Sequence, residues 1–169
     1  PLKEMGALIK SNKGKAPIEI LKSSLSDNFF YEMPIASAQV KSSLILASLA
    51  SNNSISIYEP KITRNHTERM IEYFGGKLEY SNNKNGFIKL NKSNLEPKKN
   101  YNVVGDFSSA SFIIVATLIA KKSEVLIKNV GLNPTRNGLI TVLSMMDANI
   151  EIKNQKLICN EECGDILVK

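Results

Sequence analysis

The chain is 169 residues long, 43% of them are hydrophobic, and its formal net charge at pH 7 is +6. A chain of this size can bury one sizeable core or two small ones. Its longest apolar run, residues 112–120, is far shorter than the roughly 20 residues of a membrane-spanning helix. We therefore expect a globular protein with no membrane partner, whose positive charge favours anionic ligands such as phosphate-bearing metabolites or nucleic acids.

Residues 31–90 are predicted to form one unit that begins with a short strand at 31–33 and continues into a helix. Ser37 is the expected N-cap of that helix, because a serine side chain there accepts a hydrogen bond from a free backbone N–H. The helix that follows is apolar on nearly every face, which is typical of a helix buried all round.

The second half of this unit begins with an alternating segment at Ile55 and Ile57, which predicts a strand with one covered face. An amphipathic helix follows and ends at Gly75, where a left-handed residue is expected. Two strands joined by a turn at Asn85-Gly86 complete the unit. The predicted order is β-α-β-α-β-β.

The same order recurs in residues 101–160, at a shift of about 70 residues. A short strand at 102–104 is expected before a helix whose N-cap is Asp106, and Asp147 takes the place of Gly75. The repetition predicts an α/β (α+β) fold in which several units pack around a shared helical core, with the sheets facing outward. The polar stretch 91–100 is the natural boundary between the two units.

The start of the first helix is the candidate ligand site. A helix start offers unpaired backbone N–H groups and the positive end of the dipole, which suit a phosphate. Ser37 and Ala38 are small, Gln39 adds an amide donor, and Arg64 in the loop before the next helix suits a bidentate grip on phosphate. Serines at helix starts are more often caps without a ligand, so this pattern alone leaves both interpretations open. Lys41 is interpreted as a solvated or structural charge.

The two cysteines, Cys159 and Cys163, predict neither a metal site nor a disulfide framework. The only histidine, His66, lies far away in sequence, and a lone pair of cysteines is unlike the frameworks of secreted domains. No signal peptide is predicted at the N-terminus. We expect ordinary thiols, no metal and a cytoplasmic location.

Five segments, in this order, closely resemble the 5-enolpyruvylshikimate-3-phosphate synthase family of enolpyruvyl transferases. They are "PLKEMGA", "ASAQVKSSLILASL", "TRNHTERMIEYFGG", "GDFSSASFIIVA" and "NVGLNPTRNGLI". The resemblance runs in register from Pro1 to about Ile152, and the tail at 153–169 is less distinctive.

The resemblance implies an enzyme of two domains, each an inside-out barrel of three β-α-β-α-β-β units with buried helices and outward sheets. Residues 1–100 then hold the end of one unit plus a full unit of the substrate-binding domain, 101–105 form the hinge, and 106–169 form one unit of the second domain. The implied reaction transfers the enolpyruvyl group of phosphoenolpyruvate to the 5-hydroxyl of shikimate 3-phosphate and releases phosphate, without a metal or cofactor.

By similarity, Ser37, Ala38 and Gln39 hold shikimate 3-phosphate, with Gln39 also near phosphoenolpyruvate. Arg64 approaches the sugar-like substrate or its phosphate, and Thr63 is a weaker candidate. The enzyme of this type is expected to be a monomer, and the chain by itself to self-associate.

Several motifs of the family have no counterpart here. They are an N-terminal Lys-Ser-Arg set, a Gly-rich loop, an aspartate base and the arginines and lysines that hold phosphoenolpyruvate. We therefore nominate no catalytic residue, expect the chain to be a piece of a longer protein, and expect it to be inactive as a transferase by itself.

Three other interpretations compete. The enolpyruvyl transferase that acts on a UDP-sugar has a similar fold, but its catalytic-loop cysteine has no counterpart in the segments quoted above. A basic nucleic-acid-binding module would explain the sequence pI of about 9.3, although the lysines are scattered and few aromatic residues lie among them. A purely structural repeat protein would bind no ligand at Ser37 or Gln39.

Overall fold

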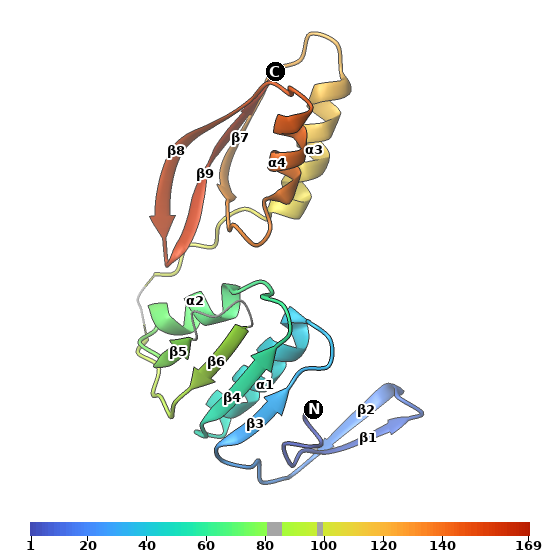
Figure 1. The fold of residues 1–169 in the computed structure, drawn as a ribbon, viewed down its shortest axis with the longest axis vertical. Helices are drawn as coiled ribbons and strands as arrows, with labels where there is room; N and C mark the ends of the chain where they lie inside the picture. Colours follow the sequence, from blue (N-terminus) through green and yellow to red (C-terminus); the bar gives the residue numbers. More distant parts are fainter. Residues whose placement is uncertain (81–85, 98–99) are drawn as a thin grey trace. The chain divides into compact units, whose positions relative to one another are not determined.

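The computed structural model describes residues 1–80, 86–97 and 100–169 (Figure 1). The chain divides into two compact units, Pro1–Pro97 and Lys98–Lys169. This division lies close to the predicted domain boundary at residue 100, while the hinge role of residues 101–105 stays a prediction.

The first unit contains a separate antiparallel hairpin and one larger sheet with two helices (Figure 1). The sheet has the order β3-β4-β6-β5, in which β3 and β4 are parallel and the other neighbours are antiparallel. The elements are β1 (Leu8–Asn12), β2 (Lys15–Leu21), β3 (Phe29–Glu32), α1 (Ala38–Ala50), β4 (Ile55–Glu59), α2 (His66–Tyr73), β5 (Leu78–Tyr80) and β6 (Gly86–Leu90).

The core of this unit lies between α1 and the sheet. Ile55 and Ile57 of β4 alternate with half-buried neighbours and face the core, as predicted from the period of two. They pack with Leu44 and Ile45, both fully buried in α1, and with Leu90 of β6.

The second unit repeats the strand arrangement of the first unit's last three strands. Its sheet has the order β7-β9-β8, all antiparallel, as β4-β6-β5 are. The elements are α3 (Phe107–Ile119), β7 (Val125–Gly131), α4 (Gly138–Met145), β8 (Ile150–Ile158) and β9 (Glu161–Val168). Ile114, Val130 and Ile166 form the centre of its core.

The predicted starts of α1 and α3 and the predicted ends of α2 and α4 are confirmed. Ser37 and Asp106 are the N-caps, and their side chains accept hydrogen bonds from the backbone N–H groups of Val40 and Ser109. The turns that follow α2 and α4 pass through left-handed residues, with φ values of 85° at Gly75 and 56° at Asp147.

The predicted strand at 102–104 is wrong. Only Gly105 pairs with the sheet, through an isolated parallel bridge to Val130. A short apolar stretch becomes a strand only where a neighbouring strand offers a ladder of hydrogen bonds, and here the contact is a single pair while Val103 is 78% exposed. The Asn85-Gly86 turn cannot be compared, because Asn85 lies outside the described residues.

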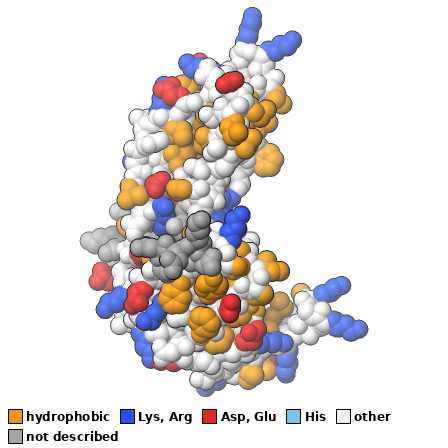
Figure 2. All heavy atoms as spheres, in the orientation of Figure 1, with side chains coloured by type: hydrophobic (Ala, Val, Ile, Leu, Met, Phe, Trp, Pro, Cys, Tyr) orange, Lys and Arg blue, Asp and Glu red, His pale blue; other side chains and the backbone are white. Residues whose placement is uncertain are grey.

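Within this chain the long helices are not buried on every face, whereas the sequence predicts such burial for the helices of a whole domain. Phe112 and Ile119 of α3 are each 79% exposed, and Leu46 of α1 is 54% exposed. Each unit has one sheet, which covers one face of its long helix, so the opposite apolar face has no cover within that unit. Figure 2 shows hydrophobic side chains reaching the surface of both units.

Candidate functional site: an anion pocket at two helix starts

A concave pocket of about 230 Å³ lies in the first unit where the N-terminal turns of α1 and α2 meet. Its lining comes from both helix starts and from the loop before α2. The lining residues are Ala38, Gln39, Ser42, Arg64, His66 and Thr67.

The start of α1 supplies the donors of this pocket. Ser37 has an extended backbone with φ −148°, and its Oγ accepts a hydrogen bond from Val40 N at 3.4 Å. The hydroxyl proton of Ser37 therefore remains able to donate. The N–H groups of Ala38 and Gln39 lie in the first turn, which has no intrahelical acceptors for them. Since α1 also has no acidic residue in its first turn, the positive end of its dipole is not neutralised there.

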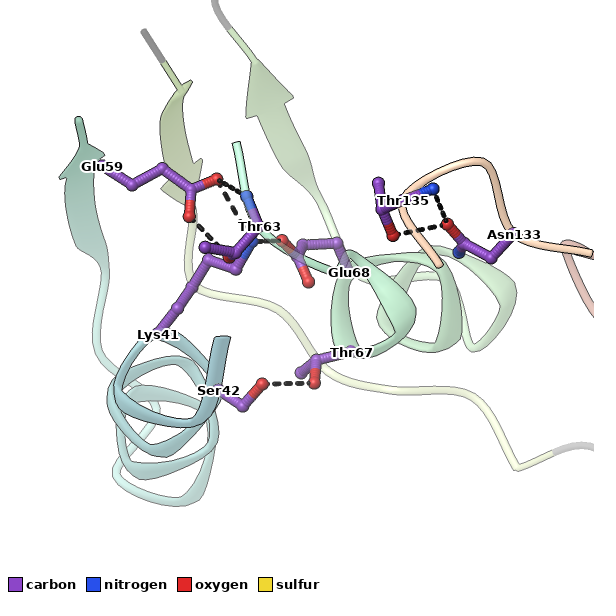
Figure 3. Close-up of polar contacts among 8 residues, drawn as sticks. All are labelled: Lys41, Ser42, Glu59, Thr63, Thr67, Glu68, Asn133 and Thr135. Atoms are coloured by element: carbon purple, nitrogen blue, oxygen red, sulfur yellow. Dashed lines mark hydrogen bonds and ion pairs between the residues drawn. The ribbon is translucent and has the colours of Figure 1, made fainter. Parts of the chain in front are cut away.

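Three of the five predicted ligand residues line the pocket together, namely Ala38, Gln39 and Arg64. Ser37 lies next to them as the cap. Thr63 does not line the pocket. Its side chain bonds to Glu59 instead: Oγ1 donates to Glu59 Oε2 at 2.6 Å, and the Thr63 N–H donates to Glu59 Oε1 at 3.2 Å (Figure 3). With its proton used in this way, the Thr63 hydroxyl has only acceptor capacity left for a ligand.

Sequence reasoning did not nominate Ser42, His66 or Thr67 as lining residues. Ser42 Oγ and Thr67 Oγ1 lie 2.7 Å apart and join α1 directly to α2 (Figure 3). No local pattern signals this contact, because it depends on how two helices separated by a strand pack together. His66 is the first residue of α2, consistent with its place directly after the capping Asn65.

The loop before α2 has a counterpart in the second unit. Thr63-Arg64-Asn65 precedes α2 and Thr135-Arg136-Asn137 precedes α4, with asparagine at the N-cap in both. The threonine is held in the same manner in both loops. In the second unit, Asn133 Oδ1 accepts from Thr135 N at 3.0 Å and from Thr135 Oγ1 at 2.7 Å (Figure 3).

The two arginines of these loops differ in their partners. Arg136 donates to Ser108 Oγ and lies 3.5 Å from Asp106 Oδ1, so its charge is met by the carboxylate that caps α3. Arg64 has no carboxylate within ion-pair distance among the residues that the structure describes, and the cap beside it is the neutral Ser37. A guanidinium and a helix N-terminus that share no internal carboxylate form a favourable environment for an anionic ligand.

Other candidate sites have less support. In the described part of the chain, no three His, Cys, Asp or Glu side chains come together as a metal site, and no helix is long and apolar enough to cross a bilayer. Both cysteines are free thiols, and burial raises the pKa of Cys163, which keeps that thiol protonated at neutral pH.

The fold is an α+β arrangement of two units, and the first unit has a pocket where two helix starts meet. A family model described as EPSP synthase (3-phosphoshikimate 1-carboxyvinyltransferase) matches residues 1–166. The chain therefore belongs to the EPSP synthase family. The match extends to residue 166 and so includes most of the tail beyond residue 152.

Two curated relatives support this membership. The 3-phosphoshikimate 1-carboxyvinyltransferase of Petrotoga mobilis is 47% identical over 171 residues, which is 100% of this chain and 39% of the relative. The enzyme of the same name from Leptospira biflexa is 46% identical, and the match covers 99% of this chain and 39% of that enzyme. The chain thus spans about two-fifths of the length of these relatives.

A solved structure agrees with the fold. The EPSP synthase from Acinetobacter baumannii superimposes with a TM-score of 0.83 at 37% sequence identity, over 99% of this chain and 38% of that one. The predicted fold class, the mixed α/β architecture of an enolpyruvyl transferase, is confirmed.

Proposed function

We propose that the protein carrying this chain transfers the enolpyruvyl group of phosphoenolpyruvate to the 5-hydroxyl of shikimate 3-phosphate, and that this chain holds shikimate 3-phosphate. One observation carries the second part: Arg64, without a carboxylate partner in the described residues, stands beside the α1 N-terminus in a pocket. The names of the relatives support the first part.

Each pocket residue then has a role that follows from its chemistry. The phosphate group accepts hydrogen bonds from the first-turn N–H groups at Ala38 and Gln39 and from the Ser37 hydroxyl, while Arg64 pairs with its charge. Ala38 is small enough to let the ligand reach the backbone. The longer Gln39 side chain reaches toward a ring hydroxyl of the ligand and toward phosphoenolpyruvate. Thr63 acts behind the pocket by fixing the loop that carries Arg64.

We also propose that the two units are repeats of one design, that residues 101–105 act as a hinge, and that the protein is cytoplasmic and needs no cofactor. The shared strand order and the paired Thr-Arg-Asn loops support the repeat. Since the chain offers no residue that we nominate as the acid or base, we expect no turnover from the 169 residues alone.

The binding role can be tested by titrating the ¹⁵N-labelled chain with shikimate 3-phosphate and following its amide signals. We expect the signals of Ser37, Ala38, Gln39 and Arg64 to shift, and Arg64→Gln to weaken binding about tenfold or more. Shikimate without phosphate is the matched ligand control and should bind much more weakly. If these amides do not move at millimolar ligand, the proposed binding role is wrong.

The transfer role needs the rest of the enzyme. A chimera in which this chain replaces the matching segment of the Petrotoga mobilis relative should release phosphate from phosphoenolpyruvate only when shikimate 3-phosphate is present. An inactive but folded chimera would count against the proposed reaction. UDP-N-acetylglucosamine as a competing ligand separates the UDP-sugar alternative, and a salt-dependent gel shift tests the nucleic-acid alternative. Neither alternative is favoured by the relatives' names.

A further inference from the structure

We propose that Lys41 is a positioning residue of the anion pocket. It holds the loop of Thr63 and Arg64 in place through Glu59, and it cancels negative charge that would otherwise repel the ligand. The anion-binding part of this role depends on the proposed function, whereas the hold on the loop does not.

The starting observation is a buried group of three charged side chains in the first unit. Lys41, Glu59 and Glu68 are each only 1% exposed. Lys41 Nζ lies 3.2 Å from Glu59 Oε1 and 2.7 Å from Glu68 Oε1. Removing such charges from water costs several kcal/mol for each ion unless they are paired. A cluster this deeply buried therefore requires its cation.

Two of the three residues come from the helices that line the pocket, and the third comes from the strand that leads into the Arg64 loop. Lys41 is in the first turn of α1, Glu59 ends β4, and Glu68 is in the first turn of α2. Figure 3 shows the lysine reaching toward both carboxylates from α1. The ion pairs thereby fasten both helix starts to the end of one strand.

Glu59 passes this constraint on to the ligand loop. Its Oε1 accepts from both Lys41 Nζ and Thr63 N, at 3.2 Å each, and its Oε2 accepts from Thr63 Oγ1. Arg64 is the next residue, so its backbone position follows from that of Thr63. Loss of the lysine would leave Glu59 without its cation and free it to turn toward water.

In the second unit the side chain that holds the loop is neutral, although its amide donates to the buried carboxylate of Glu161 at 3.2 Å. There the neutral Asn133, 1% exposed, accepts the same two hydrogen bonds from Thr135. The helix position four residues after the N-cap, which is Lys41 in α1, is Ala110 in α3. The unit whose pocket lies at its helix starts is the one that has a buried lysine between two buried carboxylates.

The charge arrangement gives Lys41 its second role. Two carboxylates behind a pocket for an anion would weaken binding, because a low-dielectric interior screens them poorly. One lysine between them leaves a single formal negative charge. Glu68 is the less satisfied carboxylate: apart from its ion pair with Lys41, neither of its oxygens accepts a well-aligned hydrogen bond from the described residues, and burial raises its pKa.

The test compares four forms of the 169-residue chain: wild type, Lys41→Met, the double variant Lys41→Met/Glu68→Gln, and Lys10→Met. Lys10 forms an exposed pair with Glu19 in the hairpin, so its replacement removes a charge without touching the cluster. Hydrogen exchange at the Thr63 amide, which donates to Glu59 Oε1, reports the position of the loop. Titration with inorganic phosphate and with shikimate 3-phosphate reports the pocket.

We expect Lys41→Met to speed exchange at Thr63 and to weaken anion binding about tenfold, while Lys10→Met changes neither by more than about twofold. The double variant still lacks the lysine but returns the cluster to one formal negative charge, so its affinity should recover most of the loss. Failure to recover would overturn the electrostatic role, and unchanged exchange at Thr63 in Lys41→Met would overturn the positioning role.

Two further outcomes are separable. If the wild-type chain binds neither ligand, the proposed function fails, and the exchange data alone decide whether Lys41 holds the loop. If Lys41→Met does not fold, Thr63→Val tests the same link from the other end, because it removes one hydrogen bond and leaves every charge in place. Faster exchange at the amide of residue 63, which donates to Glu59 Oε1, supports the link, and unchanged exchange contradicts it.

Discussion

Asp106 and Arg136 form an ion pair at 3.5 Å at the start of α3. In the first unit, the N-cap beside the corresponding Arg64 is the neutral Ser37, so no such pair forms there. Asp106 is at the same time the N-cap, since its Oδ2 accepts from Ser109 N at 2.9 Å. The Asp106 carboxylate therefore caps α3 and also neutralises Arg136, as a bound anion would.

Replacing Asp106 by serine should create in the second unit the arrangement found at Ser37. Serine caps a helix nearly as well as aspartate, so we expect the free energy of unfolding to change by less than about 1 kcal/mol. Arg136, freed of its carboxylate, should then bind phosphate together with the α3 N-terminus, seen as amide shifts at Ser108 and Ser109. Asp106→Asn is the control for charge loss with the cap kept. If neither variant gains phosphate affinity over wild type, the idea that Asp106 acts as an internal anion is wrong.

Glu68 should make the first unit less stable as the pH rises. Burial, the largest influence, raises its pKa above the usual 4.5, against the opposing effect of Lys41. Between that ordinary value and the raised one, the folded chain binds more protons than the unfolded chain, so the free energy of unfolding falls with increasing pH. Urea unfolding from pH 4.5 upward should show this fall in wild type and a flatter profile in Glu68→Gln. Equal slopes would mean that Glu68 titrates normally.

Gly86 provides the room that Glu59 needs. A Cβ at Gly86 would lie 2.7 Å from Glu59 Cγ and 2.8 Å from its Oε1, on the strand directly opposite. Gly86→Ala should therefore displace Glu59, destabilise the chain by about 1–3 kcal/mol and speed amide exchange at Thr63. Gly138→Ala is the matched control, because a Cβ there meets nothing within 4 Å. A Gly86→Ala chain as stable as the control would show that Glu59 has space to move.

The exposed apolar face of α3 should drive self-association of the chain. Phe112 and Ile119 are each 79% exposed, so replacing both by serine removes apolar surface without opening a cavity. Sedimentation should show concentration-dependent association in wild type and less of it in the double variant, whose unfolding free energy stays within about 0.5 kcal/mol per site. Ile114→Ala, at a fully buried position of the same helix, should instead cost about 2–5 kcal/mol. A monomeric wild type would contradict the expected association.

Local features of the fold could be predicted from the sequence because they depend on neighbours along the chain. Ser37 and Asp106 cap their helices through bonds three residues away, and the left-handed turns at Gly75 and Asp147 need only residues that tolerate a positive φ. The alternation at Ile55 and Ile57 likewise marks a strand with one covered face. The location of the pocket at the α1 start followed from the same local chemistry.

Tertiary structure decided what lies behind that pocket and what remains uncovered. Thr63 was a candidate ligand by sequence, but Glu59, brought to it by the end of β4, uses its donors. The burial of Lys41 against two carboxylates depends on three elements meeting, and the exposure of Phe112 depends on which face of α3 its sheet covers. Residue types can be read along the chain, but charge pairing and burial are properties of side chains from distant positions, and only their packing in space settles them.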